Sequence, residues 1–471
     1  MFEKLIDEMK NDMLRDLGML IKIPSVCVKG SSEKPYGDEV NTAFETAVHI
    51  AEHLGFKARN LKRLTEVSFG EGSKKAYIAC HLDIVDASSG WKHKPFSLTE
   101  DGEYLYGRGV LDNKGPAVAV LYAMNAVKKA GYEPKVSLKL LLGGAEETGM
   151  DDLPFYMKNY GYPDFALTPD SLFPIVNTEA GIFSGRIEFD NSGCEEKVLS
   201  ENKLNLISFN GGNASNSVPD SAEAVIKTGS DNSYGLYEYI ETLKKDEAFK
   251  HIKATTGENK IILFSKGLSA HASAPDDGIN AITQLAKFIY KLYEHTGCKN
   301  SLIDILTKYF CADTDGGALG IRCKGEILGK STLNVGLLNY EKGFFTVDMR
   351  IPCHNMTDKI KSATKKTAET YGFKLIIDKI HDYTHVPADS EFMIKLSEAY
   401  EQSTKLKAEF LGSKGLTYSK VLGGKGVAFG PVTDDNGDEG GGLHGDDEFI
   451  KTETLLKLAK TYAYAIYKLW C

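Results

Sequence analysis

The chain has 471 residues, which is too long for one ordinary hydrophobic core, so we expect at least two domains. Apolar residues make up 42% of the chain and charged residues 26%, which is typical of a globular protein and excludes a disordered or fibrous one. The formal net charge is -9 with both signs mixed along the chain, which argues against a nucleic-acid partner, because phosphate backbones need a basic patch.

The first 26 residues predict an amphipathic helix. Leu5, Met9, Met13 and Leu17 recur at helical spacing before Pro24, and charges of both signs interrupt the apolar run, unlike the core of a signal peptide. No stretch approaches the roughly 20 apolar residues of a membrane span, so we expect no membrane association. The eight cysteines form no Cys-x-x-Cys pair and are interpreted as reduced thiols, which favours the cytoplasm.

The next segments alternate between helix and strand. The patterns predict helices over 39–54 and 116–130, and short apolar strands over 76–80, 136–142 and 164–168. Such alternation implies an α/β layer with a largely parallel sheet.

From about residue 185 the pattern changes. Apolar and polar residues alternate as in half-buried antiparallel strands, with helices between them, over 185–189, 204–210, 222–226, 260–266 and 343–350.

After residue 387 the α/β pattern returns, with a helix over 390–403, a strand over 426–429 and a closing helix over 452–469. We therefore expect one α/β domain, residues 1–183 and 387–471, interrupted by an inserted α+β domain over 184–386; the family resemblance described below implies that these are the catalytic domain and its lid.

Acidic residues and a histidine follow the predicted parallel strands directly. His81 follows the first strand, Glu147 the second and Asp170 the third, while Asp112 lies in a glycine-rich turn before a helix. Because ligand sites in open α/β sheets lie beyond the carboxyl ends of the strands, we expect these four side chains in one crevice. Several acids together would repel one another unless a cation neutralised them. Imidazole and carboxylate without thiolate favour zinc or a similar divalent metal in an open catalytic site.

Other hydrolytic or nucleotide-binding motifs are absent from the sequence. It has no Gly-x-Ser-x-Gly of a serine hydrolase and no His-Glu-x-x-His of a thermolysin-like protease. Gly107-x-Gly109 is weak evidence for nucleotide binding, because Asp112 replaces the third glycine of that motif.

Several motifs together resemble those of the aminoacylase/carnosinase family of two-zinc exopeptidases, and most closely its dipeptidase V-like branch of Xaa-His (β-alanyl) dipeptidases. The resemblance covers both the α/β part and the insertion, and it implies a zinc-exopeptidase fold with a lid. In chain order, the motifs are His81-Leu82-Asp83, Gly107-Arg108-Gly109, Asp112-Asn113-Lys114-Gly115 and Glu146-Glu147-Thr148-Gly149, with Asp170 and a late His444 after them.

The resemblance implies two divalent metal ions, zinc in the first place, with manganese or cobalt as alternatives. Asp112 would bridge both ions. His81 and Asp170 would complete one metal site, and Glu147 and His444 the other. The same resemblance implies a cis peptide bond after Asp112.

Roles for the remaining site residues also follow from the resemblance. Asp83 would orient His81, as partners of metal-bound imidazoles do. Glu146 would be the general base that passes a proton to the leaving amine. In the insertion, His271 would stabilise the oxyanion of the tetrahedral intermediate, and Asn216 and Arg350 would hold the carboxylate end of the substrate.

Two segments depart from the pattern of the family. The loop 433–443 before His444 is acidic and glycine-rich, where the family more often has a shorter loop. Residues 415–419 replace a more glycine-rich turn that lies along the substrate backbone. Both departures bear on which substrate is preferred.

The predicted function is a metallopeptidase that hydrolyses short unblocked peptides, dipeptides above all, by attack of a dimetal-bound hydroxide on the amide carbonyl. The first alternative is an N-acyl amino acid deacylase of the desuccinylase or deacetylase type. The second is a catalytically silent relative that binds metal or peptide. Because the insertion is larger than the usual lid of the family, it could complete the substrate site within one chain, so we expect a monomer.

Overall fold

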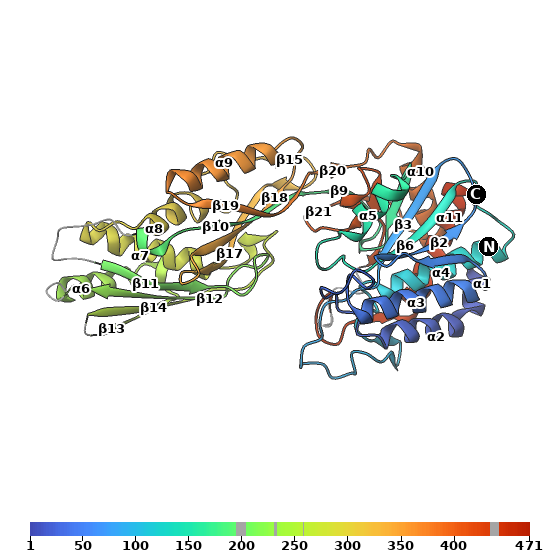
Figure 1. Cartoon of the computed structure of the whole chain (residues 1–471), viewed down its shortest axis with the longest axis horizontal. Helices are drawn as coiled ribbons and strands as arrows, with labels where there is room; N and C mark the ends of the chain where they lie inside the picture. Colours follow the sequence, from blue (N-terminus) through green and yellow to red (C-terminus); the bar gives the residue numbers. More distant parts are fainter. Residues whose placement is uncertain (195–203, 230–232, 258, 434–441) are drawn as a thin grey trace. The chain divides into compact units, whose positions relative to one another are not determined.

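The computed structural model describes residues 1–194, 204–229, 233–257, 259–433 and 442–471. It divides into two compact units, the first formed by Met1–Thr178 and Thr384–Cys471 and the second by Glu179–Tyr383 (Figure 1). The boundaries expected from the sequence, 183/184 and 386/387, fall close to these divisions. Most of the acidic loop before His444, residues 434–441, lies outside the described residues.

A mixed sheet forms the centre of the first unit. Its middle strands are parallel neighbours, and antiparallel strands flank them on both sides. The spatial order is β1 (Lys57–Asn60), β2 (Leu64–Phe69), β6 (Ser137–Gly143), β3 (Lys75–His81), β7 (Phe165–Thr168), β22 (Gly426–Ala428), β9 (Ile175–Glu179) and β20 (Thr384–His385), with β21 (Phe410–Ser413) paired to β9. The predicted α/β fold class with a largely parallel core is confirmed.

Helices cover both faces of this sheet, because successive residues of each buried strand point to opposite sides. In β3, Ile78 and Cys80 belong to one apolar core, and Tyr77 and Ala79 to the other. The first core is built with α1 (Glu3–Glu8), α2 (Lys10–Ile21), α3 (Asp38–His53), α4 (Lys114–Lys129), α10 (Glu391–Thr404) and α11 (Thr452–Trp470); the second with α5 (Asp152–Tyr160).

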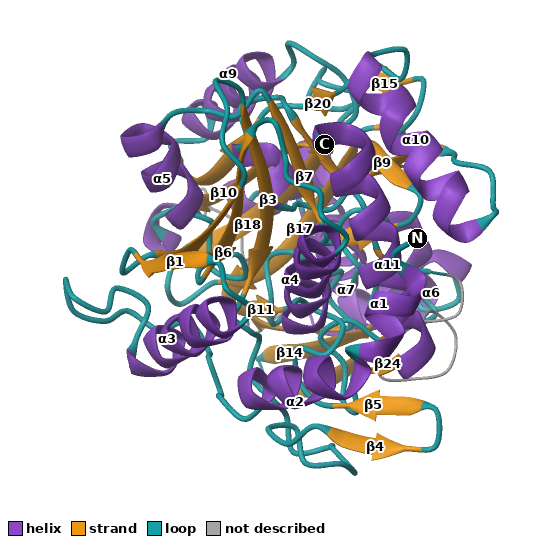
Figure 2. Ribbon diagram, turned by 90° about the vertical axis from the view of Figure 1, so that its right-hand side faces the viewer, coloured by secondary structure: helices purple, strands orange, loops and turns teal. Residues whose placement is uncertain are grey.

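Helix α4 is the central helix of the larger core, as Figure 2 shows. Its residues 114–127 are all buried, which explains why the sequence over this helix is apolar on every side. The predicted single helix at the start of the chain is interrupted at Met9, so α1 and α2 are separate elements. Among the described residues, we find no helix with the length and apolar character needed to span a membrane.

Two small sheets lie outside the main one in the first unit. In one, β24 (Phe449–Lys451) pairs antiparallel with β5 (Tyr104–Tyr106), which pairs with β4 (Thr99–Asp101). In the other, β8 (Ser171–Leu172) pairs parallel with β23 (Pro431–Val432). The first of these joins the C-terminal segment to the loop before α4.

The second unit is an antiparallel sheet with helices packed on it. Strand β14 alternates buried and exposed residues, as expected for a sheet with one covered face. Helices α6 (Ser233–Leu243), α7 (Ala281–Thr296), α8 (Ser301–Ile305) and α9 (Thr357–Thr370) share one apolar core with the sheet. The strand order is β13 (Ile252–Gly257), β14 (Lys260–Lys266), β12 (Ser221–Thr228), β11 (Leu204–Gly211), β17 (Thr332–Asn339), β18 (Phe344–Ile351), β10 (Gly181–Glu188) and β19 (Lys374–His381), and β15 (Lys324–Gly325) forms a small hairpin with β16 (Gly329–Lys330).

Candidate metal centre

Three neighbouring parallel strands end at the same edge of the sheet in the first unit. His81 is the last residue of β3 and lies opposite Gly143, the last residue of β6. The chain continues from β6 to Glu146 and Glu147, and from β7 to Asp170. The pairing order β6, β3, β7 therefore brings the predicted residues of these three exits together.

The two glycines after β6 are required by close neighbours. A Cβ atom on Gly143 would lie 1.9 Å from the hydroxyl oxygen of Tyr418, and one on Gly144 would lie 2.5 Å from carbons of Phe44 and Val40. The backbone between β6 and Glu146 therefore packs so closely against its neighbours that it leaves no room for a side chain at Gly143 or Gly144.

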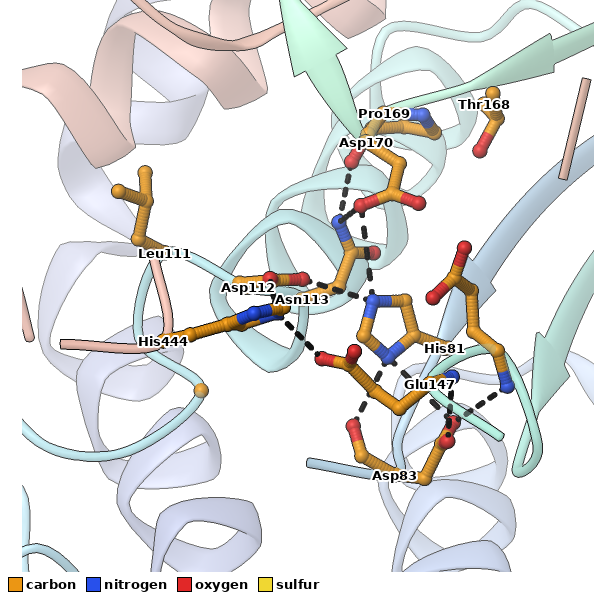
Figure 3. A network of polar contacts seen from close by, with 12 residues as sticks. His81, Asp83, Leu111, Asp112, Asn113, Glu147, Thr168, Pro169, Asp170 and His444 are labelled. Atoms are coloured by element: carbon orange, nitrogen blue, oxygen red, sulfur yellow. Dashed lines mark hydrogen bonds and ion pairs between the residues drawn. The ribbon is translucent and has the colours of Figure 1, made fainter. Parts of the chain in front are cut away.

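His81 lies at the centre of the site, with one ring nitrogen facing the acids and the other facing Asp83 (Figure 3). Its Nε2 atom is 2.9 Å from Oδ1 of Asp112 and 3.6 Å from Oδ1 of Asp170. Its Nδ1 atom is 2.9 Å from the carbonyl oxygen of Asp83 and 3.5 Å from its Oδ1. These contacts fix the orientation of a fully buried imidazole.

Asp83 has a second set of partners. The backbone N–H groups of Glu146 and Glu147 donate to its two carboxylate oxygens, at 3.2 and 3.1 Å. The family resemblance implies that Asp83 orients His81, and the shorter of its contacts to His81 is made by the backbone carbonyl oxygen of Asp83. The carboxylate of Asp83 thus connects the histidine to the loop that carries both glutamates.

His444 faces the opposite side of Asp112. Its Nε2 atom is 3.2 Å from Oδ2 of Asp112 and 3.0 Å from Oε1 of Glu147 (Figure 3). Asp112 therefore directs one carboxylate oxygen to each of two histidines. The side chain of His444 is half exposed, unlike that of His81.

The peptide bond between Asp112 and Asn113 is cis, as the resemblance implied. The Asn113 side-chain amide donates to the carbonyl oxygen of Pro169 at 2.5 Å and to Oδ1 of Asp170 at 3.3 Å. Asn113 thereby connects the turn before α4 to the exit of β7, so that Asp112 and Asp170 face the same imidazole.

Charge in this crevice is shared between carboxylates and imidazoles. Burial opposes protonation of His81, but its contacts with Asp112, Asp170 and Asp83 raise the pKa of His81 well above its ordinary value. Hydrogen bonds with Asp112 and Glu147 raise the pKa of His444 to about 10. The contacts with carboxylates therefore favour the protonated form of both imidazoles when no metal ion is bound.

Two of the acids keep raised pKa values in spite of these cations. Burial, together with the charges of Asp112 and Glu147, raises the pKa of Asp170 to about 7. Burial and the charge of Asp170 raise the pKa of Glu146 well above its ordinary range. A crowded set of buried carboxyl groups of this kind is stabilised by an added cation.

The donor set fits a divalent metal ion. One ligand atom each from His81, Asp112 and Glu147 lie within 4.8 Å of one another, and the same holds for His81, Glu146 and Asp170. Imidazole nitrogens and carboxylate oxygens are donors that zinc and manganese accept. The carboxylate of Glu146, the predicted general base, therefore lies close enough to His81 and Asp170 to bind an ion together with them.

Two buried acids that have no predicted role hold the site loops in place. The Asp152 carboxylate accepts from the backbone N–H groups of Gly144 and Ala145 and from the Tyr418 hydroxyl. Glu448 accepts from the loop that carries Asp112. Glu448 lies directly before the apolar strand β24, a position that solvated acids also occupy, so the sequence carries no signal for its burial.

The three site residues predicted in the insertion all belong to the second unit and lie near one another there. Ala272 donates its backbone N–H to the carbonyl oxygen of Asn216, and Ser217 pairs with His271 in an antiparallel bridge. Burial and the charge of Arg350 lower the pKa of His271.

Arg350 forms a buried ion pair within its own strand. Its Nε and Nη2 atoms donate to the two carboxylate oxygens of Asp348, at 2.9 and 3.2 Å. Asp348 has no predicted role, although residues two apart on a strand lie on the same face. This pair fixes the orientation of the guanidinium group.

Comparisons with known proteins agree with the motifs. The family model described as Peptidase family M20/M25/M40 matches residues 77–468. "Putative dipeptidase YtjP" of Bacillus subtilis is 32% identical over 466 residues, which cover 98% of this chain and 97% of the relative. "Putative dipeptidase SH1171" of Staphylococcus haemolyticus is 27% identical over 475 residues, which cover 100% of this chain and 99% of the relative.

Solved structures share the fold. Human carnosine dipeptidase 1 has a TM-score of 0.59 at 15% sequence identity and covers 99% of this chain and 98% of its own. The dipeptidase Dug1p of Saccharomyces cerevisiae has a TM-score of 0.58 at 16% identity, with 99% and 98% covered. The aminoacylhistidine dipeptidase of Vibrio alginolyticus has a TM-score of 0.58 at 19% identity, with 97% and 96% covered.

We expect the zinc affinity of the metal-free protein to rise with pH from about 6 to 8, because metal binding must displace protons from the imidazoles. The raised pKa values of His81 and His444 mean that both imidazoles bind protons more tightly than a free imidazole does. Each displaced proton contributes a rise of up to about tenfold per pH unit. Calorimetric titration of Zn²⁺ in buffers of different ionisation enthalpy counts the protons. Binding without proton release, at an affinity independent of pH, would contradict the assignment.

Proposed function

The chain belongs to peptidase family M20/M25/M40, and from this premise we propose that it hydrolyses unblocked dipeptides with the help of two divalent metal ions. His81 and Asp170 would hold one ion, Glu147 and His444 the other, and Asp112 both. The observation that carries this proposal is the geometry of Asp112, whose two carboxylate oxygens lie 2.9 Å from Nε2 of His81 and 3.2 Å from Nε2 of His444.

Paired divalent ions, when bound, polarise a carbonyl oxygen and lower the pKa of water. The side chains of the crevice would provide the rest of the chemistry. Asp83 keeps His81 in one orientation through contacts to its Nδ1 atom, so that Nε2 faces the acids. Asp83 also holds the backbone of Glu146 and Glu147, so the predicted base and a predicted ligand move together.

Glu146 is suited to proton transfer. Burial and the charge of Asp170 raise the pKa of its carboxyl group well above the ordinary range, which makes its carboxylate a stronger base than a solvated one. In the proposed reaction, the Glu146 carboxylate takes a proton from a water molecule, and the oxygen of that water forms a bond to the carbonyl carbon of the amide. The C–N bond of the amide then breaks, and Glu146 gives the proton to the leaving amine nitrogen.

The dipeptide specificity rests on the relatives and on the second unit. Two relatives that align over nearly the whole chain are named as dipeptidases. The roles that the resemblance assigns to His271, Asn216 and Arg350 remain proposals. The contacts with Asp348 hold the Arg350 guanidinium in one orientation, which supports this role, because an ordered cation loses little conformational entropy when a substrate carboxylate binds.

Replacement of Glu146 by glutamine should abolish turnover and leave the metal content unchanged. The amide cannot accept the proton, and we expect kcat to fall by a factor of about 100 to 10,000, the usual contribution of a general base. The measurements are dipeptide turnover and metal content by mass spectrometry. Glu71→Gln, at an exposed position of the same unit, is the matched control and should behave as the wild type. Turnover within a few-fold of wild type in Glu146→Gln would reject the proposed base.

A substrate panel separates the proposal from its two alternatives. We expect the zinc-loaded protein to hydrolyse unblocked dipeptides in preference to N-acetyl and N-succinyl amino acids, to lose activity with a chelator and to regain it with Zn²⁺. Product formation is measured by chromatography. Faster hydrolysis of the N-acyl substrates would identify a deacylase, and metal binding without any turnover would identify a silent relative.

A further inference from the structure

The Glu448 carboxylate is fully buried and satisfies four donors of one loop. Its Oε2 atom accepts from the Arg108 guanidinium and from the backbone N–H of Gly109, both at 2.9 Å. Its Oε1 atom accepts from the backbone N–H groups of Leu111 at 2.8 Å and of Asp112 at 3.0 Å. A single side chain near the C-terminus thus fixes the backbone that carries Asp112.

Arg108 extends this contact to the segment of His444. Its Nη2 atom donates to the carbonyl oxygen of His444 at 3.3 Å and to that of Asp86 at 3.4 Å. The guanidinium lies 5.0 Å from the centroid of the Trp91 ring. Because the guanidinium is planar and buried, it fixes the position of the Glu448 carboxylate relative to the carbonyl oxygen of His444.

Strand pairing sets the register of this arrangement. Phe449 of β24 lies opposite Tyr106 of β5, and the backbone N–H of Gly107 donates to the carbonyl oxygen of Glu448 at 3.1 Å. The residue after β5 and the residue before β24 are therefore neighbours. The Glu448 side chain therefore lies beside the turn from Gly107 to Asp112, and its carboxylate accepts hydrogen bonds from that turn.

A buried ion pair adds little net stability, because removal of both charges from water offsets their attraction. The four donors on Glu448 belong to the loop of one predicted metal ligand, and its ionic partner contacts the backbone of another. We propose that Glu448 is a positioning residue for the metal centre, which together with Arg108 holds Asp112 and His444 at the separation needed to share a metal ion. This inference rests on the proposed function.

The test compares Zn²⁺ binding by Glu448→Gln, Glu448→Asp and the wild type, by competition with a chromogenic chelator. We expect Glu448→Gln to bind Zn²⁺ about 10- to 100-fold more weakly, the usual effect of losing a group that holds a metal ligand. Glu448→Asp keeps the negative charge and should bind Zn²⁺ more tightly than Glu448→Gln. Wild-type affinity in a folded Glu448→Gln variant, or the reverse order of the two variants, would overturn the proposal.

Asp16→Asn is the matched control, because Asp16 is also a buried acid of the first unit, paired with Arg15 and Tyr122. It should lose stability on thermal unfolding but keep wild-type zinc affinity.

If Glu448→Gln does not fold, the Arg108→Lys variant tests the proposal instead, because lysine keeps the positive charge but lacks the planar fork of arginine. Its zinc affinity should fall, and wild-type affinity would overturn the proposal. A wild-type protein that neither binds Zn²⁺ nor cleaves dipeptides would instead refute the proposed function.

Discussion

The structure of the site depends on one electrostatic constraint, the crowding of carboxylates around a buried imidazole at the end of a parallel sheet. Asp112 and Asp170 both face Nε2 of His81, and Glu147 meets His444 beside Asp112. Without a metal ion, protons on the two imidazoles supply the countercharge, which explains why their pKa values are raised and that of Asp112 is lowered. A divalent cation in the same position would replace those protons.

The loops around this cluster are held by a second set of buried acids. Asp83, Asp152 and Glu448 each accept hydrogen bonds from successive backbone N–H groups of a loop that carries a site residue. Backbone donors fix a loop more rigidly than side chains do, because they carry no rotamer freedom. The negative charges of these acids add to the repulsion among the carboxylates of the site. Burial and the charge of Asp112, for example, raise the pKa of Glu448. The same acids that position the site thus increase its demand for a cation.

The sequence predicted the parts of the site that depend on local order. His81, Glu147 and Asp170 could be identified because each follows a recognisable apolar strand, and parallel strands end at a common edge. Asp112 was identified from its glycine-rich turn and the helix that follows. The extent of the sheet was less accessible, because edge strands such as β1 and β20 are short and partly exposed, and their pairing is set by distant segments.

Glu448 and Asp152 could not be assigned for a related reason. In a sequence, an isolated acid next to an apolar strand or at the start of a helix is indistinguishable from a solvated residue. The burial of Glu448 depends on hydrogen-bond donors more than 300 residues away in the sequence. The burial of Asp152 depends on Gly143, which leaves room for its carboxylate, and on Gly144, whose backbone N–H donates to it. The roles predicted for Asn216, His271 and Arg350 of the second unit depended on the resemblance, because no local pattern of the sequence indicates them.

Anomalous X-ray scattering at the zinc edge, from crystals of the zinc-loaded protein, would show whether Asp112 is shared between two metal ions. We expect two peaks about 3.5–4 Å apart, both bound by Asp112, one also by His81 and Asp170 and the other by Glu147 and His444. A single peak at full occupancy, or two peaks without Asp112 between them, would show that Asp112 does not bridge two ions.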